Sequence, residues 1–319
     1  MTGLKAKTIK SVLRRRTDAW LNSLPEEMRA RVKDDTIVTG GCIASMLLGE
    51  PVNDIDIYFR TKETTRLVAE HYVKEFLERR RKRGGIDVPI LVEELKDVRG
   101  DDRVRIVVKS AGVESDAGDS DYKYFECRPP EEAGDYVAEV FDDPVEIADL
   151  VEDTKEAAAA SADEPEFRPV FLSSNAITLS RKIQIIIRFF GSPDEIHENY
   201  DFVHCMNYWE ASTGALTLRS AALESLLSRT LVYNGSRYPV ASVFRIRKFI
   251  ARGWRINAGQ IVKMAIQISK LDLMNYEVLE DQLTGVDVAY FSQVLDAVKE
   301  RGETIDHAYL VEIINRLFD

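Results

Sequence analysis

Two aspartates and a pair of glycines have types and spacing that could do chemistry. Gly40-Gly41 follows a short β-type segment, and Asp54-Ile55-Asp56 comes soon afterwards in a segment of alternating polar and apolar residues. Alternate side chains of a strand share a face, so Asp54 and Asp56 are expected side by side. Adjacent carboxylates are costly unless a cation neutralises them, and Mg²⁺ prefers hard oxygen ligands. The pattern therefore predicts a site for Mg²⁺ or Mn²⁺.

The glycine pair is a candidate phosphate contact. Because glycine has no side chain in the way, backbone N–H groups at Gly40 and Gly41 could approach a phosphate where a helix begins. Ser45, slightly further on, is a third candidate contact. The alternatives are a plain turn at the glycines and a solvent-facing edge strand at the aspartates.

Hydrophobic spacing predicts the elements that must position these residues. Helices are expected over 4–23, 25–33, 42–49, 62–83 and 191–200. Strands are expected over 36–41, 54–59, 88–95, 102–110 and 201–210, with two more within 171–190 joined by a turn near 180–182. From about 217 the spacing is helical, with segments near 218–233, 239–252, 258–270, 287–300 and 306–318. The predicted fold class is α+β, with a mixed sheet flanked by helices and an all-helical C-terminal domain.

The stretch from Gly40 to Phe59 resembles the DNA polymerase β-type nucleotidyltransferase superfamily. In the head of tRNA CCA-adding enzymes and bacterial poly(A) polymerases, Gly-Gly precedes a hydrophobic helix ending in Leu-Leu-Gly, and Asp-hydrophobic-Asp follows four residues later. Here Leu47-Leu48-Gly49, Glu50-Pro51-Val52-Asn53 and Asp54-Ile55-Asp56 reproduce that spacing. Asp-x-Asp alone is a weak signal, but this combination is a strong one.

Two later segments extend the resemblance. Asp201-Phe202-Val203-His204-Cys205 is similar to an Asp-Phe-Thr-Ile-Asn segment that supplies a third carboxylate in those families. The segment from Arg245 to Arg252 is similar to their neck helix, which implies nucleotide-binding roles for Arg245, Lys248 and Arg252. The block 175–209 also resembles poorly characterised nucleotidyltransferase-like proteins of bacteriophages and other large DNA viruses.

The chain departs from the family pattern at two places. Ala44 and Ser45 stand where the family has an Arg-Asp pair, and Asn199 and Tyr200 stand where it has two arginines. Both changes remove groups expected to hold the triphosphate or the base, which argues against a true CCA-adding enzyme.

The resemblance implies a Mg²⁺-dependent nucleotidyltransferase. It would move a nucleoside monophosphate from an NTP to a hydroxyl of an RNA end, a protein or a small molecule, and release pyrophosphate. Asp54 and Asp56 would bind two Mg²⁺ or Mn²⁺ ions, and Asp201 would complete the shell of one ion. Two interpretations stay open beside it: a catalytically degenerate phage virion or assembly component, and a nucleotide-binding regulator.

Charge is distributed unevenly along the chain. The formal net charge is −11, yet residues 112–166 alone hold 19 acidic and three basic residues, a net of −16. Residues 217–270 hold ten basic residues and one acid, a net of +9. An acidic average therefore does not exclude a polyanionic substrate such as an NTP or RNA. The acidic segment is predicted to be a solvated, partly flexible insertion; the alternatives are a nucleic-acid mimic or a lid.

Three units are expected: N-terminal helices over 1–35, a nucleotidyltransferase-like head over 36–216 that contains the acidic insertion, and a helical neck and C-terminal domain over 217–319. Three scattered cysteines make neither a disulfide framework nor a zinc site, which fits a reducing compartment. No apolar run reaches the roughly 18 residues of a membrane span, so no membrane partner is expected. The expected location is cytoplasmic, in the host if phage-encoded, or the virion in the alternative interpretation.

Overall fold

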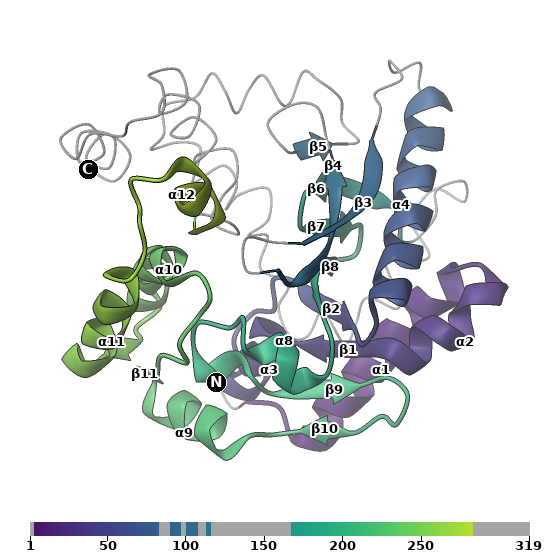
Figure 1. Ribbon diagram of the computed structural model, residues 1–319. Coiled ribbons are helices and arrows are strands. Elements are labelled where there is room, and N and C mark those ends of the chain that lie inside the picture. Colours follow the sequence, from purple (N-terminus) through teal and green to yellow (C-terminus); the bar gives the residue numbers. More distant parts are fainter. Residues whose placement is uncertain (1–2, 83–89, 97–99, 108–112, 116–166, 283–319) are drawn as a thin grey trace.

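A computed structural model of the 319-residue chain describes residues 3–82, 90–96, 100–107, 113–115 and 167–282, built around an eight-stranded mixed sheet (Figure 1). The strand order is β10-β9-β1-β2-β8-β7-β6-β5; β2 and β8 are parallel, and the other neighbours are antiparallel. The strands are β1 (Thr36–Thr39), β2 (Ile55–Phe59), β5 (Val113–Ser115), β6 (Pro169–Ser173), β7 (Ala176–Leu179), β8 (Ile183–Phe190), β9 (Tyr208–Glu210) and β10 (Leu216–Thr217). The predicted α+β class is confirmed.

Helices cover one face of this sheet. They are α1 (Ala6–Ser23), α2 (Glu26–Asp35), α3 (Gly41–Leu48) and α4 (Lys62–Lys82). The core residues of these helices pack with the apolar face of β2, where Ile55, Ile57 and Phe59 are buried. The N-terminal helices, which the sequence separated from the head at residue 35, therefore share its core.

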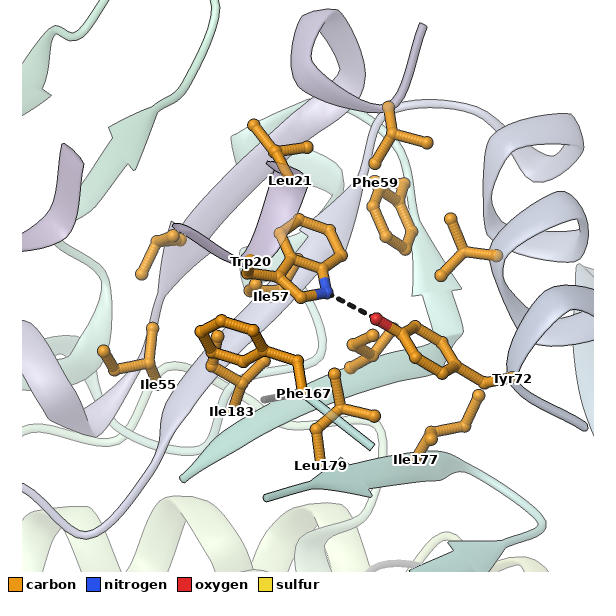
Figure 2. Packing of buried hydrophobic residues seen from close by; sticks show 14 of the residues in the cluster. Trp20, Leu21, Ile55, Ile57, Phe59, Tyr72, Phe167, Ile177, Leu179 and Ile183 are labelled. Carbon is orange, nitrogen blue, oxygen red and sulfur yellow. Dashed lines mark hydrogen bonds between the residues drawn. The ribbon is translucent and has the colours of Figure 1, made fainter. Parts of the chain in front are cut away.

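Trp20 of α1 marks the centre of this core (Figure 2). Its ring is completely buried, and its Nε1–H donates to the Tyr72 hydroxyl on α4 over 2.8 Å. The hydrogen bond satisfies two polar groups that have no access to water, and it fixes α1 relative to α4.

The remaining elements lie beyond or beside the sheet. A hairpin of β3 (Leu91–Lys96) and β4 (Asp102–Val107) precedes β5. Past β8 come α8 (Pro193–His197), the 3₁₀ turn η2 (Val203–Cys205), α9 (Ser220–Ser228), β11 (Thr230–Leu231), α10 (Pro239–Ala251), β12 (Arg255–Ile256), α11 (Ala258–Ile268) and α12 (Tyr276–Gln282). The turn predicted at 180–182 is confirmed; Arg181 and Lys182 adopt positive φ there.

Two element predictions are wrong. Residues 201–210 are expected to be one strand, but only 208–210 form one. Before them, Phe202 makes an isolated antiparallel bridge with Tyr233, and the Cys205 carbonyl accepts from the Gly40 N–H instead of from a neighbouring strand. The helix expected over 218–233 stops at Ser228, since Arg229 is left-handed and the next residues pair in parallel with β12. The last third is thus not purely helical.

Several expectations fall outside the described residues. These are the helices at 287–300 and 306–318, the end of the long helix beyond Lys82, and nearly all of the acidic segment 112–166. Within the described part of the chain, no helix has both the length and the apolar character needed to cross a bilayer.

Removing the Tyr72 hydroxyl should weaken the core. In Tyr72→Phe the buried Trp20 Nε1–H loses its acceptor, so we expect the free energy of unfolding to fall by about 1–3 kcal/mol. Urea unfolding followed by tryptophan fluorescence measures the change. Tyr208→Phe on the opposite face of the sheet is the matched control, expected to stay within about 0.5 kcal/mol. Equal losses in the two variants would contradict the prediction.

Candidate functional site

Asp54, directly before β2, and Asp56, within it, lie on the polar side of this strand, opposite the core. Ile55 and Ile57 point into the core and are at most 1% exposed, whereas Asp54 and Asp56 are only partly buried on the other face. The predicted alternation is therefore confirmed. Tyr58 lies on the same face as Asp56 and forms a small second apolar cluster with Ile37 and Ile196.

Gly40 lies directly against the Asp56 carboxylate. It connects β1 to α3 with φ of +102°, and a Cβ built at this position would lie 2.7 Å from Asp56 Oδ2. The pairing of Val38 with Ile57 brings the end of β1 beside the aspartates. A Cβ at Gly41, by contrast, would meet nothing within 4 Å. Only the first glycine of the pair is thus required by packing.

The surroundings of Asp56 disfavour negative charge. Burial, followed by the nearby Asp54 charge, raises the pKa of Asp56 to about 8. Burial is also the main cause that raises the pKa of the Cys42, Cys205 and Tyr200 side chains, so these neighbours stay neutral at pH 7. A divalent cation between Asp54 and Asp56 would remove the repulsion and the desolvation cost together.

Gln184 joins this face, and sequence reasoning missed it. It is the register partner of Asp56 on the parallel strand β8, and the buried Ile183 and Ile185 on either side turn to the core. Its side chain therefore shares the face of Asp56, where an amide oxygen is a further hard ligand for a cation. Nothing in the sequence indicates that β2 pairs with β8, which lies more than 120 residues further along the chain.

Asp201 is held by the neck instead. Its carboxylate is 8% exposed, accepts a hydrogen bond from the Ser242 hydroxyl over 2.9 Å, and forms an ion pair with Arg245 of α10. In the described part of the chain, no three His, Cys, Asp or Glu side chains lie close enough together to share a metal ion. Asp54, Asp56 and Asp201 thus do not form the expected three-carboxylate cluster, and Asp201 has Arg245 as its cationic partner.

The other neck residues predicted to bind nucleotide have separate places. Arg252, at the end of α10, pairs with Glu50 over 3.0 Å, and Glu50 also pairs with Arg229 over 2.7 Å. Lys248 is exposed on α10. Glu50 lies in the short loop between α3 and β2, so this bridge ties the neck to the segment that leads into Asp54.

The positions where the chain departs from the family pattern are taken up by packing. Ala44 of α3 is 5% exposed and belongs to a neck core with Phe202 and Trp254, which leaves no room for an arginine. Asn199 Nδ2 donates to the Glu195 carbonyl at the end of α8, and the Tyr200 ring packs on Tyr58 and His197.

Ser45, His197 and His204 are buried. Ser45 lies inside α3 with 8% exposure. His204 packs against Trp254 with ring centroids 4.3 Å apart, and burial lowers its pKa to about 3. His197 Nε2 lies 2.8 Å from the Thr39 hydroxyl, and burial lowers its pKa to about 4.

Comparison with known families and proteins gives two matches. The model of the family described as "Gabija anti-defense 2 family protein" matches residues 11–229, a span that includes Gly40, Asp54, Asp56, Gln184 and Asp201. A protein of Bacillus phage SPbetaL7, "Gabija anti-defense 2", is 26% identical over 121 residues, which are 37% of this chain and 30% of that protein. The match thus spans less than a third of the relative's length.

Solved structures with some similarity include CCA-adding enzymes. One is the Bacillus stearothermophilus enzyme in complex with CTP, at a TM-score of 0.35 and 10% identity, covering 86% of this chain and 48% of that one. Another is the Thermotoga maritima enzyme complexed with tRNA, at a TM-score of 0.35 and 12% identity, covering 89% and 54%.

A side chain at Gly40 should distort the site. In Gly40→Ala the added Cβ meets Asp56 Oδ2, and the alanine must adopt a strained positive φ. We therefore expect the free energy of unfolding to drop by about 1–3 kcal/mol. Gly41→Ala is the matched control; it has open space at a helical position and should keep or raise stability. Urea unfolding of both variants is the measurement. Equal effects would show that Gly40 does not touch the carboxylate.

The raised pKa of Asp56 gives a pH dependence without divalent ions. Between about pH 4 and pH 8 the folded state holds a proton on Asp56 that the unfolded state has lost, so stability falls as pH rises, by at most about 1.4 kcal/mol per pH unit. Asp56→Asn has a neutral side chain at every pH in this range, so it lacks this pH dependence. Its stability relative to the native chain should therefore increase from pH 5 to pH 8, measured by urea unfolding in EDTA. A difference that does not change with pH would contradict the assignment.

Proposed function

Because the chain belongs to the Gabija anti-defense 2 family, we propose that it is a Mg²⁺-dependent nucleotidyltransferase that counteracts Gabija defence. One observation carries the proposal. Asp54 and Asp56 share the polar face at the start of β2, and Asp56 lies beside Gly40, within the Gly-Gly, Leu-Leu-Gly and Asp-x-Asp spacing that resembles the nucleotidyltransferase superfamily. The anti-defence role comes from the family and its phage relative, and the chemistry comes from the site.

The donor set fits a divalent cation. Asp54 and Asp56 offer carboxylates in a setting that raises the pKa of Asp56, and Gln184 offers an amide oxygen on the neighbouring strand. Bound Mg²⁺ or Mn²⁺ would supply charge neutralisation for the triphosphate and activate the acceptor oxygen. We retain two ions as the expectation, with Asp54 and Asp56 as their principal ligands.

The remaining groups position the substrate. The open side of Gly41 and the first N–H groups of α3 form a place where phosphate oxygens can approach the backbone. Lys248 adds positive charge from the neck, and Arg252 does so beside its partner Glu50. In the reaction, an acceptor hydroxyl oxygen bonds to the α-phosphorus of an NTP, the bond from that phosphorus to pyrophosphate breaks, and the hydroxyl proton passes to water. Positioning and charge neutralisation supply most of the rate.

The acceptor is an RNA end, a protein or a small molecule, and the host cytoplasm is the proposed place of action. Ala44, Asn199 and Tyr200 favour an activity other than CCA addition, because packing residues replace the arginines that are expected to hold the triphosphate or the base in that family's pattern. The match covers only 30% of the phage relative's length, so an activity of that relative is assigned to this chain only as part of the proposal.

A second candidate function rests on Asp201. Its ion pair with Arg245 leaves two carboxylates instead of three on the metal-binding face, which suits a protein that binds a nucleotide without turning it over. Such a protein would counteract Gabija by sequestering a nucleotide or by acting as a nucleotide-binding regulator. A virion or assembly component is the remaining form of this alternative.

Loss of the two aspartates should separate these functions. We expect Asp54→Ala/Asp56→Ala to abolish the transfer of label from α-labelled NTPs in Mg²⁺ or Mn²⁺, to abolish the Mg²⁺-dependent rise in melting temperature, and to abolish protection of infecting phage in Gabija-defended cells. The control is Glu26→Ala/Glu27→Ala, which removes two exposed carboxylates of α2 and should change none of these.

The outcomes are distinct. Label transfer lost together with protection supports the enzyme. Protection that survives in the aspartate variant overturns it in favour of a non-catalytic protein. Nucleotide binding without label transfer by the native chain, tested with all four NTPs and host extract, supports the second candidate.

A further inference from the structure

Helix α11 is docked with its polar side inward and its apolar side outward. Gln260 Oε1 accepts from the Tyr233 backbone N–H over 3.0 Å, and Gln267 bonds both the Tyr233 hydroxyl and the Ser236 carbonyl over 2.7 Å. Met264 is the buried apolar contact on this side. The two glutamines therefore fix which face of α11 turns away from the molecule.

The outward face forms an apolar stripe: Ala258, Ile261, Val262, Ala265 and Ile266. Positions i, i+3, i+4, i+7 and i+8 lie along one side of a helix. Ile261, Val262 and Ile266 are 49–55% exposed, although such residues normally face a core. A contiguous exposed apolar surface of this kind marks a place where another segment or protein docks.

We propose that the stripe is covered by residues 306–318 of this same chain. Their sequence places Leu310, Ile313, Ile314 and Leu317 at helical spacing, an apolar face complementary to the stripe. The stripe is about 12 Å long from Ala258 to Ile266, which a helix of that length covers easily. The resulting contact would be an αα pair built on the neck.

The point where the described chain ends favours this occupant. Gln282, the last residue of α12, donates from Nε2 to the Arg237 carbonyl over 3.0 Å, and Gln267 of α11 donates to the carbonyl of the preceding residue, Ser236. The chain thus leaves α12 close to the C-terminal half of α11. Figure 1 shows α10, α11 and α12 grouped on one side of the molecule. The segment that follows Gln282 therefore begins near α11.

Charge favours the same occupant and disfavours a second copy. Residues 239–270, around the stripe, contain seven basic residues and no acid. Residues 306–318 contain two acidic residues and one basic residue, a net of −1, within 283–319, where seven acidic and three basic residues give a net of −4. A two-fold dimer through the stripe would bring the same basic surfaces face to face. Residues 306–318 instead bring a small net charge of the opposite sign.

Hydrogen exchange of the full chain, followed by mass spectrometry, tests the docking. Ile266→Glu places a charge in the contact and should raise the exchange rate of 306–318 by at least about tenfold. Leu227→Glu is the control; Leu227 is 88% exposed on α9, outside the stripe, and the same change there should leave 306–318 unaffected. In the reciprocal pair, Leu310→Glu should raise exchange across 258–268, and Asn315→Glu, on the other face, should not.

Three results would overturn the proposal. The first is unprotected exchange of 306–318 in the native chain. The second is an exchange rate of 306–318 that is the same in Ile266→Glu as in the native chain. The third is a native mass in solution of twice the chain mass that halves in Ile266→Glu, which would assign the stripe to a second copy.

Discussion

The close contact between Gly40 and the Asp56 carboxylate is the constraint on which the site depends. A backbone with φ of +102° has to pass within contact distance of a carboxylate that is already desolvated and repelled by Asp54. That approach requires β1 to pair with β2, and it sets where α3 begins. The apolar face of β2 makes the arrangement possible, because its burial against α1 and α4 holds the strand while its polar face carries an unfavourable pair of acids.

The sequence predicts the parts of the fold that local patterns control. The strand–Gly-Gly–helix–Asp-x-Asp order and the shared face of Asp54 and Asp56 follow from period-2 alternation and glycine placement, and the structure confirms them. It also confirms the turn at 180–182, which joins two apolar strands. The wrong predictions concern segments whose conformation depends on contacts with residues distant in the sequence. The segment 201–207 has strand-like composition, but its backbone bonds to Val232 and Gly40, and the end of α9 depends on pairing with β12.

The candidate site divides in the same way. Asp54, Asp56 and Gly40 could be identified from spacing, whereas Gln184 could not, since its place depends on the parallel pairing of β8 with β2. The similarity of Asp201 to a third carboxylate was local in sequence, and its actual partner, Arg245, lies on a helix about forty residues later. A motif fixes the types of nearby residues but not which charges approach them from other elements.

The ion pair of Asp201 with Arg245 has a consequence for how this protein can evolve. The boundary predicted at residue 216 suggests a place where recombination could exchange domains. However, the Asp201 carboxylate before this boundary is bound by Ser242 and Arg245 after it. A recombinant that acquired a foreign neck without a hydroxyl and a guanidinium at positions 242 and 245 would carry a buried, unpaired charge, at a cost of about 3–5 kcal/mol. Head and neck are therefore expected to be inherited together, and residue 201 is expected to change together with residues 242 and 245.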